Sequence, residues 1–111
     1  MKISMDELEH GVRLILLEGK LDSLGVEKIE MDFFRYCGGT KHHVLIDLSR
    51  VSYISSIGIP MLVDAAKDVL KHGGKMALVS PQKHVMDVLE LVGVSRIIPI
   101  YPDLKMARAS M

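Results

Sequence analysis

The sequence has a single cysteine, Cys37, and no surplus of charge of either sign. One cysteine excludes an internal disulfide and any CxxC-type metal or redox motif, as is typical of a reducing compartment. Fourteen basic and fourteen acidic residues cancel, so the global charge favours neither nucleic acid nor an anionic membrane as a partner. The chain also lacks the run of roughly 18 apolar residues that spans a bilayer, and its first residues lack the apolar stretch of a signal peptide. We therefore expect a cytoplasmic protein without membrane or direct nucleic-acid contacts.

Length and apolar content limit the number of domains. The chain has 111 residues, of which 49% are hydrophobic, enough for one compact core and too few for two. No repeat, linker or low-complexity tract divides it. We expect a single domain over residues 1–111.

Five short segments carry the pattern of β-strands. They are apolar or β-branched runs bounded by turn residues. The segment HVLID, at 43–47, has the composition of a central strand covered by helices, and residues 48–53 after it are predicted to form a link. Pro99 places the last strand at a sheet edge. The five predicted strands are 3–7, 12–21, 43–47, 75–80 and 96–101.

The first two helices are marked by apolar stripes and glycine stops. Either Asp22 or Ser23 can cap the first helix, which ends at 38–39. The second helix begins near 56–58 and ends at 73–74. The apolar stripes predicted to face the core are Val26, Ile29, Phe33, Tyr36 and Cys37 in the first helix, and Leu62, Ala65, Ala66, Val69 and Leu70 in the second.

Two further helices follow the fourth and fifth strands. Ser80 as N-cap and Pro81 as first residue predict the start of the third helix, which closes at Gly93. Its stripe is Val85, Val88, Leu89 and Val92. A terminal helix starts at 102–103. Strands and helices thus alternate, so we expect an α/β fold with a mixed, mainly parallel sheet, in which an amino-terminal hairpin adds the antiparallel pair.

The segment YISSIGIP, residues 53–60, connects the central strand to the second helix. It puts Ser55 and Ser56 at a helix start, and Pro60 is tolerated in a first helical turn. Serine is a preferred N-cap residue, so one interpretation is that Ser56 only caps the helix. The other is that a partner recognises or modifies it.

Three stretches that together span most of the chain resemble the STAS domain of bacterial anti-sigma factor antagonists. They are LEGKLD, VLIDLSRVSYISSIGIPMLVDAAK and HGGKMALVSPQKHVMDVLELVGVSRIIPIY. In that family a strand carrying an aspartate, here Asp47, precedes a segment that contains a phosphorylated serine. The resemblance places Ser55 at an Asp/Ser position, Ser56 at the phosphoacceptor, Ile57 at a small-residue position and Gly58 at the glycine.

The resemblance implies a binding module of the STAS fold, not an enzyme. The implied partner is a GHKL-type serine kinase that is also an anti-sigma factor, which the unmodified antagonist sequesters and phosphorylation of Ser56 releases. A PP2C-type phosphatase resets the cycle. No cofactor is implied for this chain, because nucleotide and Mg²⁺ belong to the kinase. The implied partner-binding residues are Asp22, Ser55, Ser56, Ile57 and Gly58.

Other polar residues give weaker signals. Asp22 is interpreted equally well as a helix cap or as a partner contact, and Asp47 is expected to orient the loop around Ser56. His42 and His43 are adjacent, so they point to opposite faces of a strand, and no further ligands join them, which argues against a metal site. SSIG is not a G-x-S-x-G elbow, which argues against a hydrolase.

Two alternatives to a phosphorylation switch stay open. One is a STAS scaffold that works without phosphorylation, of the stressosome or lipid-transport-accessory kind. The other is a STAS domain that binds a small ligand through the same loop.

Overall fold

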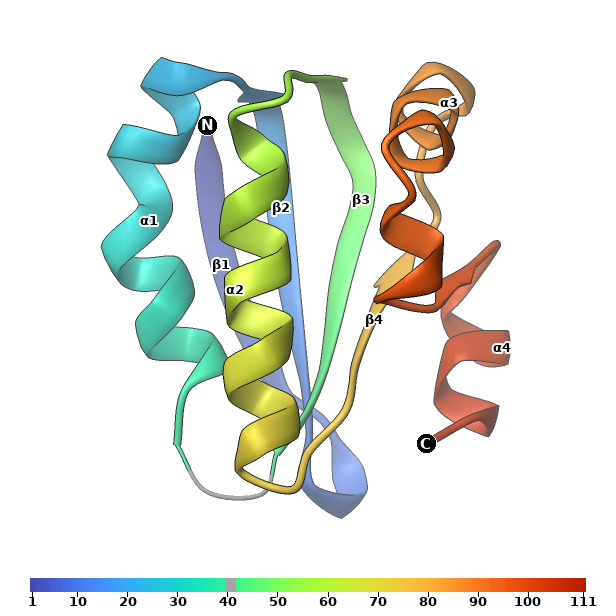
Figure 1. Ribbon diagram of the computed structural model, residues 1–111. Coiled ribbons are helices and arrows are strands. Elements are labelled where there is room, and N and C mark those ends of the chain that lie inside the picture. The colour runs from blue at the N-terminus through green and yellow to red at the C-terminus, as the bar shows by residue number, and fades with distance from the viewer. Residues whose placement is uncertain (40–41) are drawn as a thin grey trace.

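Strands and helices alternate along the chain, as the periodicity predicts (Figure 1). The structure is a computed structural model that describes residues 1–39 and 42–111. The order of its elements confirms the α/β class. The elements are β1 (Lys2–Glu7), the 3-10 turn η1 (Glu9–Gly11), β2 (Val12–Leu21), α1 (Ser23–Cys37), β3 (His43–Ile54), α2 (Gly58–Lys71), β4 (Met76–Val79), α3 (Lys83–Leu91), the 3-10 turn η2 (Val94–Arg96), β5 (Ile100–Tyr101) and α4 (Leu104–Ala109).

The five strands form one sheet in the order β1-β2-β3-β4-β5. β1 pairs with β2 in the antiparallel sense, and the other three pairs are parallel. The sheet is therefore mixed and mainly parallel, as predicted. β3 is the central strand, and its first half, 44–46, is buried. Helices on both sides of the sheet account for this continuous apolar run, because Val44 and Ile46 pack in one core cluster and Leu45 packs in the other, which includes α4.

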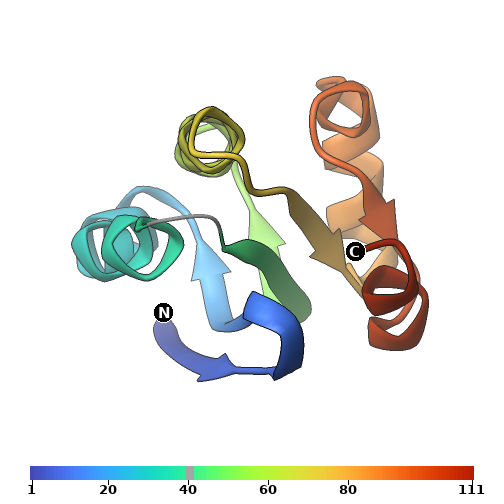
Figure 2. The ribbon, with the colours of Figure 1, turned by 90° about the horizontal axis from the view of Figure 1, so that it is seen from below.

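The two faces of the sheet are covered unequally (Figure 2). α1, α2 and α3 lie on one side, which we call the helix face, and the larger core cluster fills the space between them and the sheet. α4 lies on the opposite side, which we call the open face, where it packs on β4 and β5. The open face of β1, β2 and the middle of β3 lies outside this contact.

Residues 48–53, which were predicted to form a link, are instead the second half of β3. They stay paired with β2 as far as the register Leu21↔Ile54, but the register shifts twice, each time adding one residue to β3. Because of these bulges, the buried residues Leu48, Val51 and Ile54 recur every third position. The alternation by two that marks a strand in the sequence is lost at such irregularities.

The predicted start of the third helix is also wrong. α3 begins at Lys83, with Gln82 at the N-cap position. Ser80 has a φ of 55° and donates its hydroxyl to the carbonyl of Pro102 at 3.2 Å. The Gln82 amide donates to the carbonyl of Ser49 at 3.0 Å. Contacts with distant segments therefore determine the course of the chain from β4 to α3. A prediction from the local serine–proline pair cannot take these contacts into account.

The last strand is shorter than the predicted 96–101. Only Ile100–Tyr101 pair with β4, because η2 precedes them and Ile98 is buried in the larger core cluster. β5 lies at the sheet edge, as Pro99 predicts. Two residues assigned to the apolar stripes, Leu70 and Val92, are exposed. The other stripe residues are buried or half-buried.

Cys37 lies on the buried stripe of α1. Burial raises the pKa of its thiol from 9.0 to about 12, an effect that nearby Arg13 opposes and Asp68 reinforces. The thiol is therefore neutral and shielded at neutral pH, and it packs as a small apolar group.

Within the described ranges, 1–39 and 42–111, no helix has both the length and the apolar character required to cross a membrane.

Candidate functional site

Two loops meet at the carboxyl end of the sheet. β2 and β3 are parallel, so the loop into α1 and the loop into α2 leave the sheet at the same end (Figure 1). The carbonyl of Leu21 accepts hydrogen bonds from the backbone N–H of Ser55 at 3.1 Å and from the Ser55 hydroxyl at 3.5 Å. The peptide around Ser55 is thereby tied to the end of β2.

Asp22 follows directly and caps α1. Its carboxylate accepts a hydrogen bond from the backbone N–H of Gly25 at 2.8 Å, and its carbonyl accepts one from Val26 at 2.9 Å. The cap interpretation of Asp22 is confirmed. A partner contact through the same half-buried side chain stays a prediction.

Ser56 does not cap α2. The helix begins at Gly58, Ile57 occupies the N-cap position, and no side chain of the described residues makes a cap hydrogen bond there. Ser56 is exposed, and among the described residues its hydroxyl has no hydrogen-bond partner. The same part of the chain offers no acceptor to the backbone N–H groups of Ser56 and Ile57. The site thus presents a free hydroxyl beside the positive end of a helix dipole.

Gly58 brings the two loops close together. It is buried, and a Cβ atom at this position would lie 2.8 Å from Cγ of Leu21 and 3.1 Å from the Leu21 carbonyl oxygen. Any side chain here would push the start of α2 away from the end of β2. Gly58 therefore positions the exposed residues before it and offers little surface of its own.

Three exposed apolar side chains lie at this end of the sheet and form what we call the apolar rim. They are Leu24 in the first turn of α1, Tyr53 near the end of β3 and Ile57 before α2, exposed by 75%, 48% and 53%. Exposed large apolar side chains that gather in one place mark interaction surfaces. The sequence predicted Ile57 as part of the site and missed the other two. The sequence did contain a signal for Leu24, because this apolar residue lies outside the buried stripe of its helix.

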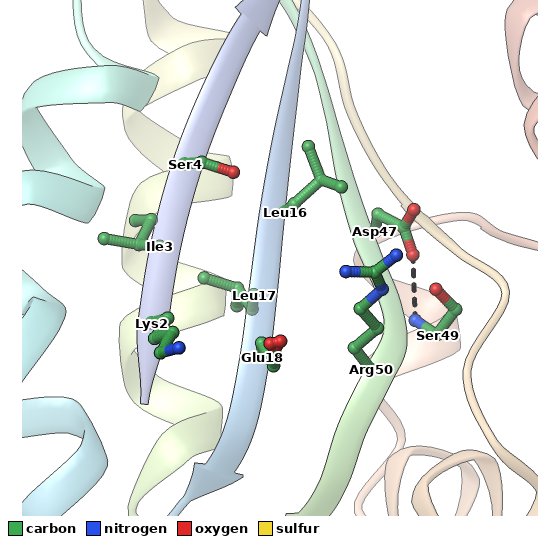
Figure 3. Close-up of a pocket in the computed structure, with 9 residues that line it drawn as sticks. All are labelled: Lys2, Ile3, Ser4, Leu16, Leu17, Glu18, Asp47, Ser49 and Arg50. Carbon is green, nitrogen blue, oxygen red and sulfur yellow. Dashed lines mark hydrogen bonds between the residues drawn. The ribbon is translucent and has the colours of Figure 1, made fainter.

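Asp47 lies elsewhere, on the open face. Its carboxylate accepts a hydrogen bond from the backbone N–H of Ser49 at 2.8 Å, and no hydrogen bond joins it to the Ser56 loop in the described part of the chain. It lines a shallow pocket of about 230 Å³ over β1, β2 and β3 (Figure 3). Its interpretation as the residue that orients the loop is therefore not supported.

The two adjacent histidines gather no ligand set. In the ranges 1–39 and 42–111, no three His, Cys, Asp or Glu side chains lie close enough together to hold a metal ion. His43 leaves its buried Nδ1 without a hydrogen-bond partner among these residues.

The sequence profile of the STAS domain matches residues 5–107. The chain belongs to the STAS domain family. A curated relative, BtrV of Bordetella bronchiseptica, whose assignment as an anti-sigma factor antagonist is provisional, is 29% identical over 99% of this chain and 94% of its own length.

Solved STAS structures have the same architecture. An anti-sigma-factor antagonist domain protein from Planctomyces limnophilus superposes with a TM-score of 0.86 at 25% identity, covering 97% of this chain and 96% of that one. The unphosphorylated anti-sigma factor antagonist SpoIIAA superposes with a TM-score of 0.72 at 19% identity, over 89% and 87% of the two chains. A Bacillus SpoIIAA has also been solved in its phosphorylated form. At this identity the likeness to SpoIIAA shows a shared fold.

Proposed function

We propose that this STAS protein is a cytoplasmic anti-sigma factor antagonist whose binding is switched by phosphorylation of Ser56. Its partner is an anti-sigma factor that is also a GHKL-type serine kinase, and sequestering that partner frees a sigma factor. A PP2C-type phosphatase removes the phosphate. The chain is a binding module and catalyses no reaction of its own.

The observation that carries the proposal is the environment of Ser56. Its hydroxyl is exposed and free of hydrogen bonds within the described chain, while its neighbour Ser55 is held to the Leu21 carbonyl. A kinase needs an accessible hydroxyl on backbone that can enter its active site. Only the second serine of the pair offers this without breaking a tertiary contact.

The apolar rim supports a protein partner. Tyrosine and large aliphatic side chains supply much of the binding free energy at interfaces, and they do so best around a desolvated centre. A phosphate on Ser56 would bring a charge of about −1.5 to −2 into that centre. The bulk and hydration of the phosphate oppose burial of the same apolar side chains. Binding and modification at this site therefore exclude one another.

The modified residue is the direct test. With its cognate kinase and Mg-ATP, the wild-type protein is expected to gain one phosphate, mapped by mass spectrometry to Ser56. Ser56→Ala should gain none. Ser55→Ala is the matched control: it should still be phosphorylated, more slowly if loss of the hydroxyl bond to Leu21 loosens the loop. Phosphate mapped to Ser55 would contradict the assignment.

The phosphorylation assay, a thermal-stability measurement and a turnover assay together separate the alternatives. A scaffold that works without phosphorylation would bind partners but accept no phosphate from any kinase encoded nearby. A small-ligand STAS domain would show a higher melting temperature with nucleotides or lipids, because a ligand that binds only the native state stabilises it. Turnover of ATP or an ester by the purified chain, lost in Ser56→Ala, would instead indicate an enzyme.

Ile57 is expected to be a binding hot spot. Truncating it to alanine removes exposed apolar surface beside the switch and should weaken the complex about thirtyfold, or about 2 kcal/mol. Isothermal titration calorimetry with the purified partner measures the change. Stability should hardly change, because this side chain is largely exposed.

Leu70→Ala is the control. Leu70 is an equally apolar, exposed residue near the end of α2, about 20 Å along the helix axis from Ile57 at 1.5 Å per residue. Its truncation should leave the affinity unchanged. Equal losses for the two variants would remove the apolar rim from the interface.

A further inference from the structure

The two edges of the sheet differ in how well they are protected from other strands. At one edge, β5 is only two residues long and is flanked by Pro99 and Pro102. Short edge strands and prolines are devices that block edge-to-edge pairing. At the other edge, β1 runs for six residues without proline and in unbroken register with β2. A regular, unblocked edge strand is a template for another strand.

The side chains of β1 separate cleanly between the two faces. Ile3 and Met5 pack against the larger core cluster on the helix face. Lys2, Ser4 and Asp6 are exposed and lie on the open face; Figure 3 shows Ser4 and Ile3 leaving β1 on opposite sides. A strand added at this edge must continue both faces.

The charges of β1 are self-complementary. If two copies of β1 pair in antiparallel fashion about Ser4, residue 2 lies opposite residue 6 of the second copy, residue 3 lies opposite residue 5, and Ser4 lies opposite Ser4. Lys2 then lies opposite Asp6 of the second copy, and Asp6 opposite its Lys2. On the helix face, Ile3 meets Met5. Directly opposite side chains of unlike charge, and opposite apolar side chains, stabilise a strand pair.

Lys2 and Asp6 are available for such pairs. Neither makes a salt bridge within the described residues, whereas the next acidic residue, Glu7, is already held by Arg13 at 3.0 Å. Other registers of the β1–β1 pair are less favourable. A shift by one residue would place apolar side chains opposite charged ones and would reverse the faces.

We propose that β1 pairs with β1 of a second copy of this chain, forming a two-fold symmetric dimer with one continuous sheet. A two-fold contact through the same strand closes on itself and does not propagate into a fibre. The two chains run in opposite directions, so the two Ser56 sites point to opposite ends of the dimer. Dimerisation is therefore independent of the phosphorylation switch.

The test exploits the two charge pairs, with the association constant measured by analytical ultracentrifugation over a concentration series. Lys2→Asp makes both ends of β1 acidic, and Asp6→Lys makes both ends basic. Each variant alone should self-associate at least about tenfold more weakly than wild type, because like charges face each other. An equimolar mixture of the two should associate as wild type does, since the acidic edge then faces the basic one.

Several controls accompany the mixture. The double variant Lys2→Asp with Asp6→Lys should dimerise like wild type, and Glu90→Lys, a charge reversal on exposed α3, should change nothing. Wild-type association should weaken in high salt, which screens exposed pairs. Ser56→Asp should leave the dimer intact, so failure of the phosphorylation proposal would not affect this result.

Two outcomes would overturn the proposal. One is a wild-type chain that stays monomeric throughout the series. The other is a mixture that associates no better than its components. If a monomeric wild type captured another protein and lost it on Lys2→Asp, the edge would belong to a strand of that protein, and self-pairing would be refuted.

Discussion

Phosphorylated protein is expected to bind its kinase partner about a hundredfold or more weakly than the unmodified protein. The reason is that a doubly charged group would have to lose its water inside an apolar contact formed by Leu24, Tyr53 and Ile57. Surface plasmon resonance with immobilised partner, using protein phosphorylated to completion, measures the loss. Phosphatase treatment of the same sample should restore the original affinity.

Two substitutions of Ser56 test how the affinity for the partner depends on the charge at this position. Ser56→Ala should keep wild-type affinity and stability, because the hydroxyl makes no hydrogen bond in the described structure. Ser56→Asp should bind with intermediate affinity, since a carboxylate carries less charge and bulk than a phosphate. The same aspartate lies near the helix amino terminus and should raise stability by about 0.3–1 kcal/mol. Opposite changes in affinity and stability would show that the charge acts on the interface; undiminished binding of the phosphorylated protein would refute the switch.

Gly25→Ala is expected to destabilise the protein by about 3 kcal/mol. Gly25 lies buried in the first turn of α1, and a Cβ atom there would overlap the backbone carbonyl oxygen of Lys20. Main-chain atoms of β2 cannot turn aside as a flexible side chain can. The start of α1 would have to move, which also loosens the Asp22 cap. The melting temperature in differential scanning calorimetry should fall by about 10 °C or more.

Helix propensity alone predicts the opposite change in stability for Gly25→Ala. Alanine is favoured over glycine inside a helix by about 1 kcal/mol, so Gly25→Ala would raise the melting temperature if the local preference decided the outcome. Gly93→Ala provides the comparison. That glycine has a φ of +80°, and no atom of the described part of the chain lies within 4 Å of the added Cβ, so only backbone strain of about 1 kcal/mol opposes the substitution. A smaller loss for Gly25→Ala than for Gly93→Ala would contradict the steric reading.

The sequence predicted the elements whose signal is local. The apolar stripe of α1 recurs with the 3.6-residue period of a helix, because burial of one helix face leaves that period in the sequence. The glycines that follow α1 and α2 mark the ends of these helices, as predicted. HVLID was recognised as the central strand because a strand covered on both faces is apolar throughout. The second half of β3 and the start of α3 were missed, since bulges and contacts with remote carbonyls leave no such period.

For the candidate site, sequence pattern alone placed two serines at the start of α2 and left open which of them matters. Resemblance to the STAS family selected Ser56, but neither pattern nor resemblance could exclude that it caps the helix. The tertiary structure decided this point: a hydrogen bond to Leu21, a residue 34 positions away, holds Ser55, and within residues 1–39 and 42–111 the Ser56 side chain makes no cap hydrogen bond to α2. It also brought Leu24 and Tyr53 to the same end of the sheet as Ile57. Parallel strands bring the ends of distant segments to one edge of the sheet, and a linear pattern does not contain that proximity.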